Sequence, residues 1–337
     1  MAEAAPAAPV SPYFNVTEAD EALHEPGPEP DWNESAFFHL VETDGRSGSL
    51  FRIGRRVNEQ RAEVTALRLM DDGSALVGFD RPAISGNDAW RAGALDFVRE
   101  AGEWRVTFDG TLSHLAKGEA FADPGAALRS SPRVDTRFEL AATDVAPAYR
   151  TSADGTYHGG EAIAKDHYAG VARVHGRVTI DGESREMAGF GFRDHSWGPR
   201  NWQAIDCWRW AYGQLDGDNL FSVVVMWHDG QPDVAGIAVR NGRPEVIREA
   251  RVRTTYGARP TFYADGVKVV IPHPEGEITA TFRSTSRLPL RHRKGEEILR
   301  IVEQLAEVSI DGTPGVGWFE TCDRMSDGTP FGMAQGI

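Results

Sequence analysis

Short apolar segments separated by turn signals run through the first half of the chain. Residues 1–30 come before them and lack a periodic apolar pattern, so we expect a loose, disordered N-terminal arm. Order is expected to begin at Trp32, and glycine-containing turns lie beside the later segments. This rhythm predicts an antiparallel β-sandwich or barrel. The predicted strands are LFRIGRR (50–56), EVTALRLM (63–70), ALVGF (75–79), ALDFV (94–98), EWRVTF (103–108) and RVDTRFEL (133–140).

The clearest hairpin joins residues 171–180 to the segment after Asp181-Gly182, because apolar and polar residues alternate up to this strong two-residue turn. If the turn sets the register, Tyr168 faces His195 across the pair. In the same register Arg177 faces Glu186, and this pair of opposite charges supports the register.

Antiparallel strands are predicted in the second half as well. The run at 220–227, LFSVVVMW, is continuously apolar and predicts a buried central strand. The segment 295–308 is ambiguous, because its apolar residues fit a helical stripe while Asp311-Gly312 and residues 315–320 suggest a closing hairpin. Further strands are predicted at 207–215, 234–239, 267–271 and 277–282.

The domain organisation follows from a Pro- and Gly-containing stretch at 141–165, which is typical of a connection between lobes. We therefore predict an N-terminal β-lobe at residues 31–165 and a C-terminal β-lobe at residues 166–337. A chain of 337 residues is long enough for two domains of ordinary size.

Composition narrows the function classes. A net charge of −14 argues against nucleic acid and anionic membrane surfaces as partners, and no apolar run is long enough to span a bilayer. The distant cysteines Cys207 and Cys322 predict neither a disulfide framework nor a structural zinc site. The N-terminus has no signal-peptide pattern, so a cytoplasmic location is expected. Oligomeric state stays open.

One stretch concentrates the candidate chemistry. Residues 189–202, GFGFRDHSWGPRNW, combine a carboxylate, an imidazole, two guanidinium groups and two indoles. Buried charges must be partnered or neutralised, so a plain core strand would avoid an Asp-His pair. We interpret this stretch as the floor of a ligand site.

The same stretch carries a family resemblance. The GxGxRDHSWGxR pattern, together with WNES at 32–35 and GWFE at 317–320, resembles the AttH-like/carotenoid 1,2-hydratase (hydroxyneurosporene synthase) superfamily. The resemblance implies two lipocalin-like β-barrels or sandwiches that pack together. It also implies hydration or cyclisation of apolar substrates without a redox cofactor.

Hydration of an isolated alkene requires a proton donor, a site for the cation and a water molecule. Asp194 would share an apolar face with Phe192, and desolvation there would keep its carboxyl group protonated. His195 would relay protons, with Tyr168 as its hydrogen-bond partner. In the predicted register, however, Asp194 and His195 point to opposite faces.

Aromatic faces would stabilise the cation, because the ring quadrupole attracts positive charge. A hydratase is the first expectation, and a cyclase, an isomerase or a pericyclase is the alternative. A carrier for an apolar ligand would use the same cavity without catalysis. The candidate substrate-binding residues are Trp197, Trp202, Trp208, Trp210, Phe192, Arg193, Arg200, Glu34 and Glu320.

Structural roles compete with these assignments. Asp194 could be ion-paired with Arg193 or Arg200, and the tryptophans could be ordinary core residues. We expect no metal, since HExxH spacing is absent, although His167 and Asp166 lie near Asp194 and His195 in the hairpin. A GxSxG nucleophile elbow is also absent.

Overall fold

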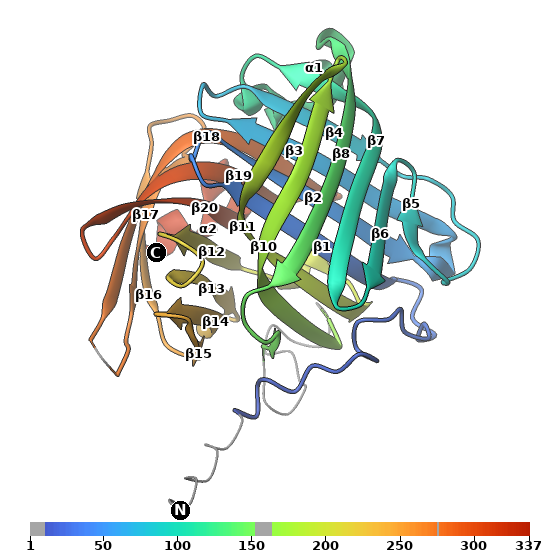
Figure 1. The fold of residues 1–337 in the computed structure, drawn as a ribbon. Coiled ribbons are helices and arrows are strands. Elements are labelled where there is room, and N and C mark those ends of the chain that lie inside the picture. Colours follow the sequence, from blue (N-terminus) through green and yellow to red (C-terminus); the bar gives the residue numbers. More distant parts are fainter. Residues whose placement is uncertain (1–10, 152–163, 275) are drawn as a thin grey trace, which may run out of the picture.

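Two large antiparallel sheets make up the protein (Figure 1). The computed structural model describes residues 11–151, 164–274 and 276–337. Because the two sheets contain nearly all of the regular secondary structure, the predicted all-β class is confirmed. The first sheet contains β1 (Trp32–Glu42), β2 (Ser47–Arg56), β3 (Arg61–Met70), β4 (Ala75–Asp80), β5 (Trp90–Ala92), β6 (Leu95–Glu100), β7 (Glu103–Leu115), β8 (Arg133–Asp144), β9 (Tyr149–Arg150), β10 (Asp166–Ile180) and β11 (Glu183–Pro199).

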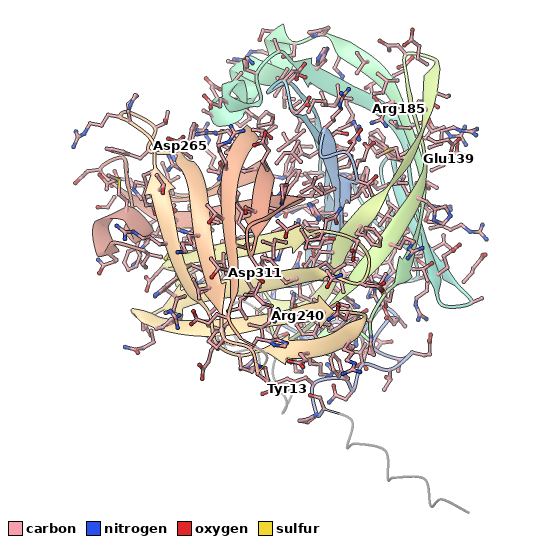
Figure 2. All side chains as sticks on the ribbon, turned by 60° about the vertical axis from the view of Figure 1, so that its left-hand side comes forward. Tyr13, Glu139, Arg185, Arg240, Asp265 and Asp311 are labelled. Atoms are coloured by element: carbon pink, nitrogen blue, oxygen red, sulfur yellow. The ribbon has the colours of Figure 1, made fainter. Side chains whose placement is uncertain are left out.

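The second sheet is built from the strands that follow. Its outer surface, like that of the first sheet, carries charged side chains, and Figure 2 shows Glu139, Arg185 and Asp265 at the periphery of the molecule. The strands are β12 (Cys207–Gln214), β13 (Leu220–His228), β14 (Gln231–Arg240), β15 (Arg243–Ile247), β16 (Arg251–Tyr256), β17 (Ala264–Ile271), β18 (Ile278–Lys294), β19 (Glu297–Ile310), β20 (Thr313–Ser326) and β21 (Thr329–Pro330).

Both sheets repeat one strand order. The first runs β4-β3-β2-β1-β11-β10-β8-β7-β6-β5, and an added pairing of β4 with β7 closes part of it into a barrel. The second runs β15-β14-β13-β12-β20-β19-β18-β17-β16. Each sheet begins with a run of hairpin-connected strands, β1 to β4 in the first sheet and β12 to β15 in the second. The last long strand of each sheet then pairs with the first strand of that run: β11 pairs with β1, and β20 pairs with β12. β11 and β20 therefore occupy equivalent places.

Short helices lie between the strands and after the last one. They are η1 (Val57–Glu59), η2 (Gly118–Ala122), α1 (Pro124–Ser130), η3 (Trp202–Ala204) and α2 (Phe331–Gln335). Helix α1 starts where the Asp123 carboxylate accepts a hydrogen bond from the backbone N–H of Ala126 at 3.0 Å, with Pro124 in the first turn. With η2, it covers one end of the space between the sheets.

The hairpin of β10 and β11 has the predicted register. Tyr168 pairs with His195, Arg177 with Glu186, and Asp181 and Gly182 both adopt positive φ in the turn. The hairpin was expected to open the second lobe, but β10 pairs with β8, and β11 pairs with β1. The change of sheet falls between β11 and β12, not at residue 166. Division into separate domains stays a prediction.

The ambiguous segment at 295–308 forms a strand. β19 pairs with β18 and with β20, so the closing-hairpin alternative is confirmed and the helical one is wrong. Its apolar residues satisfy a helical stripe, but the segment is buried between two strands, and both faces of such a strand need apolar residues.

The expectation of a disordered N-terminal arm is wrong for the residues of the arm that the structure describes. Residues 1–10 lie outside the described part, as do residues 152–163 of the expected connection. From residue 11 on, the arm packs on the first sheet: Glu21 is 7% exposed and accepts hydrogen bonds from Tyr168 and Arg193. Polar contacts of this kind hold the arm, and a search for apolar periodicity misses them.

The core has three main parts. One apolar cluster fills the first barrel, and another lies against the second sheet on its far side. A third joins the facing surfaces of the two sheets and includes Trp208, Trp210 and Trp318. In the part of the chain that the structure describes, no helix is long and apolar enough to cross a membrane.

Candidate active site between the two sheets

A cavity of about 440 Å³ lies between the facing surfaces of the two sheets. Aromatic side chains from both sheets line it: Phe37 and Phe192 come from the first sheet, and Trp208 and Trp210 from β12. Trp202 of η3 lies 6.2 Å from Trp208, measured between ring centroids. The cavity size and its aromatic lining suit a small molecule with a large apolar surface.

Charged and polar groups gather on the walls of the same cavity. Arg52 on β2 lies 3.7 Å from the carboxylate of Glu63 on β3, and Arg200 donates a hydrogen bond to the Ser196 hydroxyl at 2.6 Å. His292 on β18 stacks on Trp202 at 4.3 Å. Burial and nearby arginines lower the pKa of His292 to about 4, so its imidazole is neutral near pH 7.

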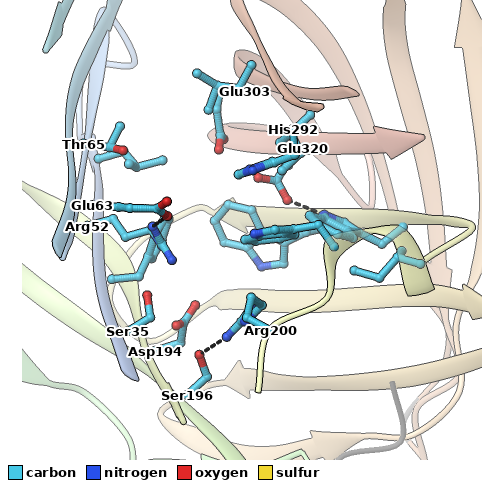
Figure 3. A pocket seen from close by; sticks show the side chains of 18 of the residues that line it. Ser35, Arg52, Glu63, Thr65, Asp194, Ser196, Arg200, His292, Glu303 and Glu320 are labelled. Atoms are coloured by element: carbon cyan, nitrogen blue, oxygen red, sulfur yellow. Dashed lines mark hydrogen bonds and ion pairs between the residues drawn. The ribbon is translucent and has the colours of Figure 1, made fainter. Parts of the chain in front are cut away.

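Asp194 points into this cavity from β11 (Figure 3). It shares the face with Phe192, as alternation predicts, and its side chain is 23% exposed. Its carboxylate lies 3.9 Å from His167 Nε2. Arg193 points the other way and forms ion pairs with Glu21 and Asp144 in place of Asp194. The cavity therefore holds the carboxyl group that the sequence pattern singled out.

Two further carboxyl groups line the opposite wall. Glu303 on β19 lies directly across from Glu320 on β20, and Figure 3 shows both on the far side of the cavity from Asp194. Trp318 Nε1 donates to Glu303 at 2.8 Å, and Trp208 Nε1 donates to Glu320. Burial raises the pKa of both carboxyl groups, and the negative charge of Glu303 raises that of Glu320 further.

His195 faces the other side of β11, inside the end of the first barrel. Its Nε2 lies 2.9 Å from Glu34 Oε1, and its Nδ1 lies 3.2 Å from the Tyr168 hydroxyl, as predicted for that pair. His24 Nδ1 contacts the same Glu34 oxygen at 2.8 Å. Burial works to raise the pKa of Glu34, but hydrogen bonds from the two histidines outweigh it and lower the pKa.

This His24–Glu34–His195 group is also where a metal ion could bind. One ligand atom from each residue lies within 4.8 Å of the others. The same atoms already form hydrogen bonds within the group, which explains their burial without an ion. Trp197 packs beside the group, 3.8 Å from His24 between ring centroids. The arrangement ties the N-terminal arm to the first sheet.

The structure divides the predicted site residues into two sets. The sheet separates the sets because successive side chains of β11 alternate. His195 and Tyr168, predicted to act beside Asp194, therefore lie across the sheet from the cavity. The set lining the cavity is Phe192, Asp194, Arg200, Trp202, Trp208, Trp210 and Glu320. The set on the barrel side is Glu34, Tyr168, Arg193, His195 and Trp197.

Sequence reasoning missed Glu303. The signal was present: counting back from the Asp311-Gly312 turn, as for the first hairpin, places Glu303 opposite Glu320. It was hidden because 295–308 also fits a helix. Glu21 and His24 were missed because they lie in an arm without periodicity.

A family described as a domain of unknown function, DUF7064, matches residues 17–325. The chain belongs to this family. No curated protein shows significant sequence similarity to this chain. Solved structures reproduce the DUF7064 fold at low identity, and they confirm the predicted resemblance to the AttH-like, lipocalin-type fold.

A putative AttH from Nitrosomonas europaea is 15% identical, with a TM-score of 0.56 over 95% of this chain and 98% of that chain. CghA in complex with Sch210972 is 17% identical, with a TM-score of 0.56 over 89% of this chain and 90% of that chain. At this identity, the likeness establishes the fold of the DUF7064 chain and leaves its reaction open.

Proposed function

We propose that this protein is a cofactor-independent acid–base enzyme that acts on an apolar small molecule of isoprenoid or polycyclic type. Hydration of a carbon–carbon double bond, or its reverse, is the first candidate reaction. The supporting observation is a single cavity that combines carboxyl groups on opposite walls, Asp194 and Glu320, with a lining of tryptophan and phenylalanine. A protonation reaction on an apolar substrate needs both features.

The chemistry begins with proton transfer from a cavity carboxyl group to an alkene carbon. Asp194 is the donor expected from the sequence, and Glu320 is a second carboxyl group within the same cavity. The resulting cation lies against the indole faces of Trp208 and Trp210, where the ring quadrupoles stabilise positive charge. Water then captures the cation and loses a proton to a base.

Cyclisation or isomerisation shares the first step but omits the water. The deep apolar lining also suits this alternative, because it keeps water away from the cation. A carrier would bind the same ligand without turnover. A cytoplasmic location stays a prediction.

The test combines turnover and binding. Wild-type protein, Asp194→Asn and Asp166→Asn are incubated with terpenoid and polycyclic alkenes in D₂O, and product masses are read by liquid chromatography–mass spectrometry. Asp166 is the matched control, a half-buried carboxylate on the neighbouring strand that pairs with Arg150. Product carrying deuterium and added water from wild type and Asp166→Asn, but not from Asp194→Asn, supports a hydratase.

Other outcomes separate the alternatives. Deuterium without added water indicates an isomerase or cyclase. If all three proteins bind the terpenoid and polycyclic alkenes equally and none converts them, the result contradicts the enzyme proposal and favours a carrier.

A further inference from the structure

We infer that Glu303 and Glu320 share one proton, and that Glu320 is the catalytic residue that donates it to the substrate while Asp194 accepts the proton released by the captured water. This inference rests on the proposed function and assigns to Glu320 the donor role that the sequence pattern suggested for Asp194.

The shared proton follows from the geometry of the second hairpin. Glu303 and Glu320 are directly opposite residues on antiparallel strands, and both line the wall of the same cavity. Glu303 is only 3% exposed. Two carboxylates at directly opposite positions in a poorly solvated site would repel each other strongly. One of the two must therefore carry a proton.

The indole donors suit a carboxyl group that cycles between acid and carboxylate. Trp318 Nε1 donates to Glu303, and Trp208 Nε1 donates to Glu320. These N–H groups are fixed by packing and stay in place when the proton leaves, so they stabilise the negative charge that forms. Trp208 also lines the cavity, which places the Glu320 carboxyl group beside the aromatic surface.

Titratable groups around the pair favour the protonated form of Glu320. Besides Glu303, Asp194 on β11 raises the pKa of Glu320 by its charge. Cys322 lies on the same strand as Glu320, and burial raises the pKa of its thiol. His39 on β1 contacts Trp318, and burial lowers its pKa to about 3, so it brings no positive charge near pH 7. His292 on β18 is neutral for the same reason.

Asp194 is in a different setting. It is more exposed than Glu303, lies 3.9 Å from His167 Nε2, and interacts electrostatically with Arg52. Two carboxyl sites in one cavity with contrasting surroundings are the arrangement that separates an acid from a base.

The step balances as follows. The O–H bond of Glu320 breaks, and the alkene π electrons form a C–H bond with the departing proton. The adjacent carbon becomes a cation, and Glu320 becomes a carboxylate. A water oxygen bonds to the cation, and one water proton passes to the Asp194 carboxylate. Asp194 then releases a proton to solvent, and the glutamate pair takes one up, so the net reaction is alkene plus water to alcohol.

The first experiment needs no substrate. Infrared difference spectra are recorded at neutral pH between wild type and Glu320→Gln, and between wild type and Asp194→Asn. We expect a carboxylic acid C=O band that is lost in Glu320→Gln and kept in Asp194→Asn. A spectrum in which Glu320→Gln loses only carboxylate bands would overturn the shared proton.

The second experiment measures the donor role with a substrate that wild type converts. Glu320→Gln keeps the side-chain size and an acceptor for Trp208, and we expect kcat to fall by roughly 10²–10⁴-fold. Glu303→Gln removes a like charge, so the pKa of Glu320 falls and the high-pH limb of kcat/KM moves to lower pH. A purely structural role would not move that limb. Thermal melting confirms that both variants fold.

The two proposals fail in different ways. If wild type converts no alkene, the proposed function and the donor role fail together, and the infrared result decides the shared proton alone. If wild type is active and Glu320→Gln is equally active, the donor role fails and the proposed function stands.

Discussion

Glu303 and Glu320 lie directly across from each other on β19 and β20, and each accepts a hydrogen bond from a tryptophan indole. A like-charged cross-strand pair is destabilising when both members are ionised. The pair also lies in the wall of the cavity, opposite Asp194. Its titration should therefore affect the stability of the fold as well as any chemistry.

The pH dependence of stability gives the first prediction. Both carboxyl groups have a folded-state pKa above the ordinary value of 4.5, so the folded protein binds more protons than the unfolded chain. The stabilisation that these groups contribute is complete below that value and is lost as pH rises through the raised pKa values. Glu320→Gln should therefore gain in Tm relative to wild type as pH rises above 4.5.

Thermal melts of both proteins across this range check the prediction. A constant difference in Tm would mean that the two carboxyl groups titrate alike in the folded and unfolded states.

The indole of Trp208 gives a second prediction. Trp208→Phe keeps an aromatic ring in the cavity but removes the N–H that donates to Glu320. A hydrogen bond to a charged group contributes about 1.5–3 kcal/mol, so kcat should fall by roughly 10- to 100-fold. Trp202→Phe is the comparison, because Trp202 stacks on His292, and its effect should be smaller. Equal losses in kcat would assign both indoles to shape alone.

The anchor of the N-terminal arm gives a third prediction. Glu21 is buried and accepts hydrogen bonds from Tyr168 and Arg193. Glu21→Gln leaves the Arg193 guanidinium less well neutralised, and we expect a loss of about 3 kcal/mol in the free energy of unfolding. Glu18→Gln is the control, because the Glu18 side chain is 79% exposed, and its loss in the free energy of unfolding should be much smaller.

Denaturant unfolding of the two variants measures the difference. Similar values for both would show that the arm is not held by Glu21.

The glycines of the central motif give a fourth prediction. A Cβ at Gly191 would lie 1.7 Å from the backbone oxygen of His39 on the neighbouring strand, so no side chain fits without moving β1 or β11. Gly191→Ala should lower the free energy of unfolding by about 3 kcal/mol or more.

Gly125→Ala in helix α1 is the matched control. A Cβ there meets the flexible end of Arg129 at 3.1 Å, and alanine favours helix, so stability should be kept. Equal unfolding midpoints for the two variants would contradict a close approach of β1 and β11.

Local patterns allowed much of the fold to be predicted. The two-residue turns at Asp181-Gly182 and Asp311-Gly312 set the hairpin registers, since strand alternation has a fixed period of two. The same period placed Asp194 and His195 on opposite faces of one strand. Phe192, Asp194 and Trp202 of the motif at 189–202 line the cavity, and their part in a ligand site stays a prediction.

The sequence by itself determined the strands, their turns and the face on which each side chain lies, because these depend on neighbours along the chain. Only the tertiary structure decided that β11 pairs with β1, that the faces of Asp194 and Glu320 meet across one cavity, and that Glu21 ties the arm to Arg193. These contacts join residues far apart in the chain. They form because each sheet must bury an apolar face against another surface, and the local pattern does not specify that surface.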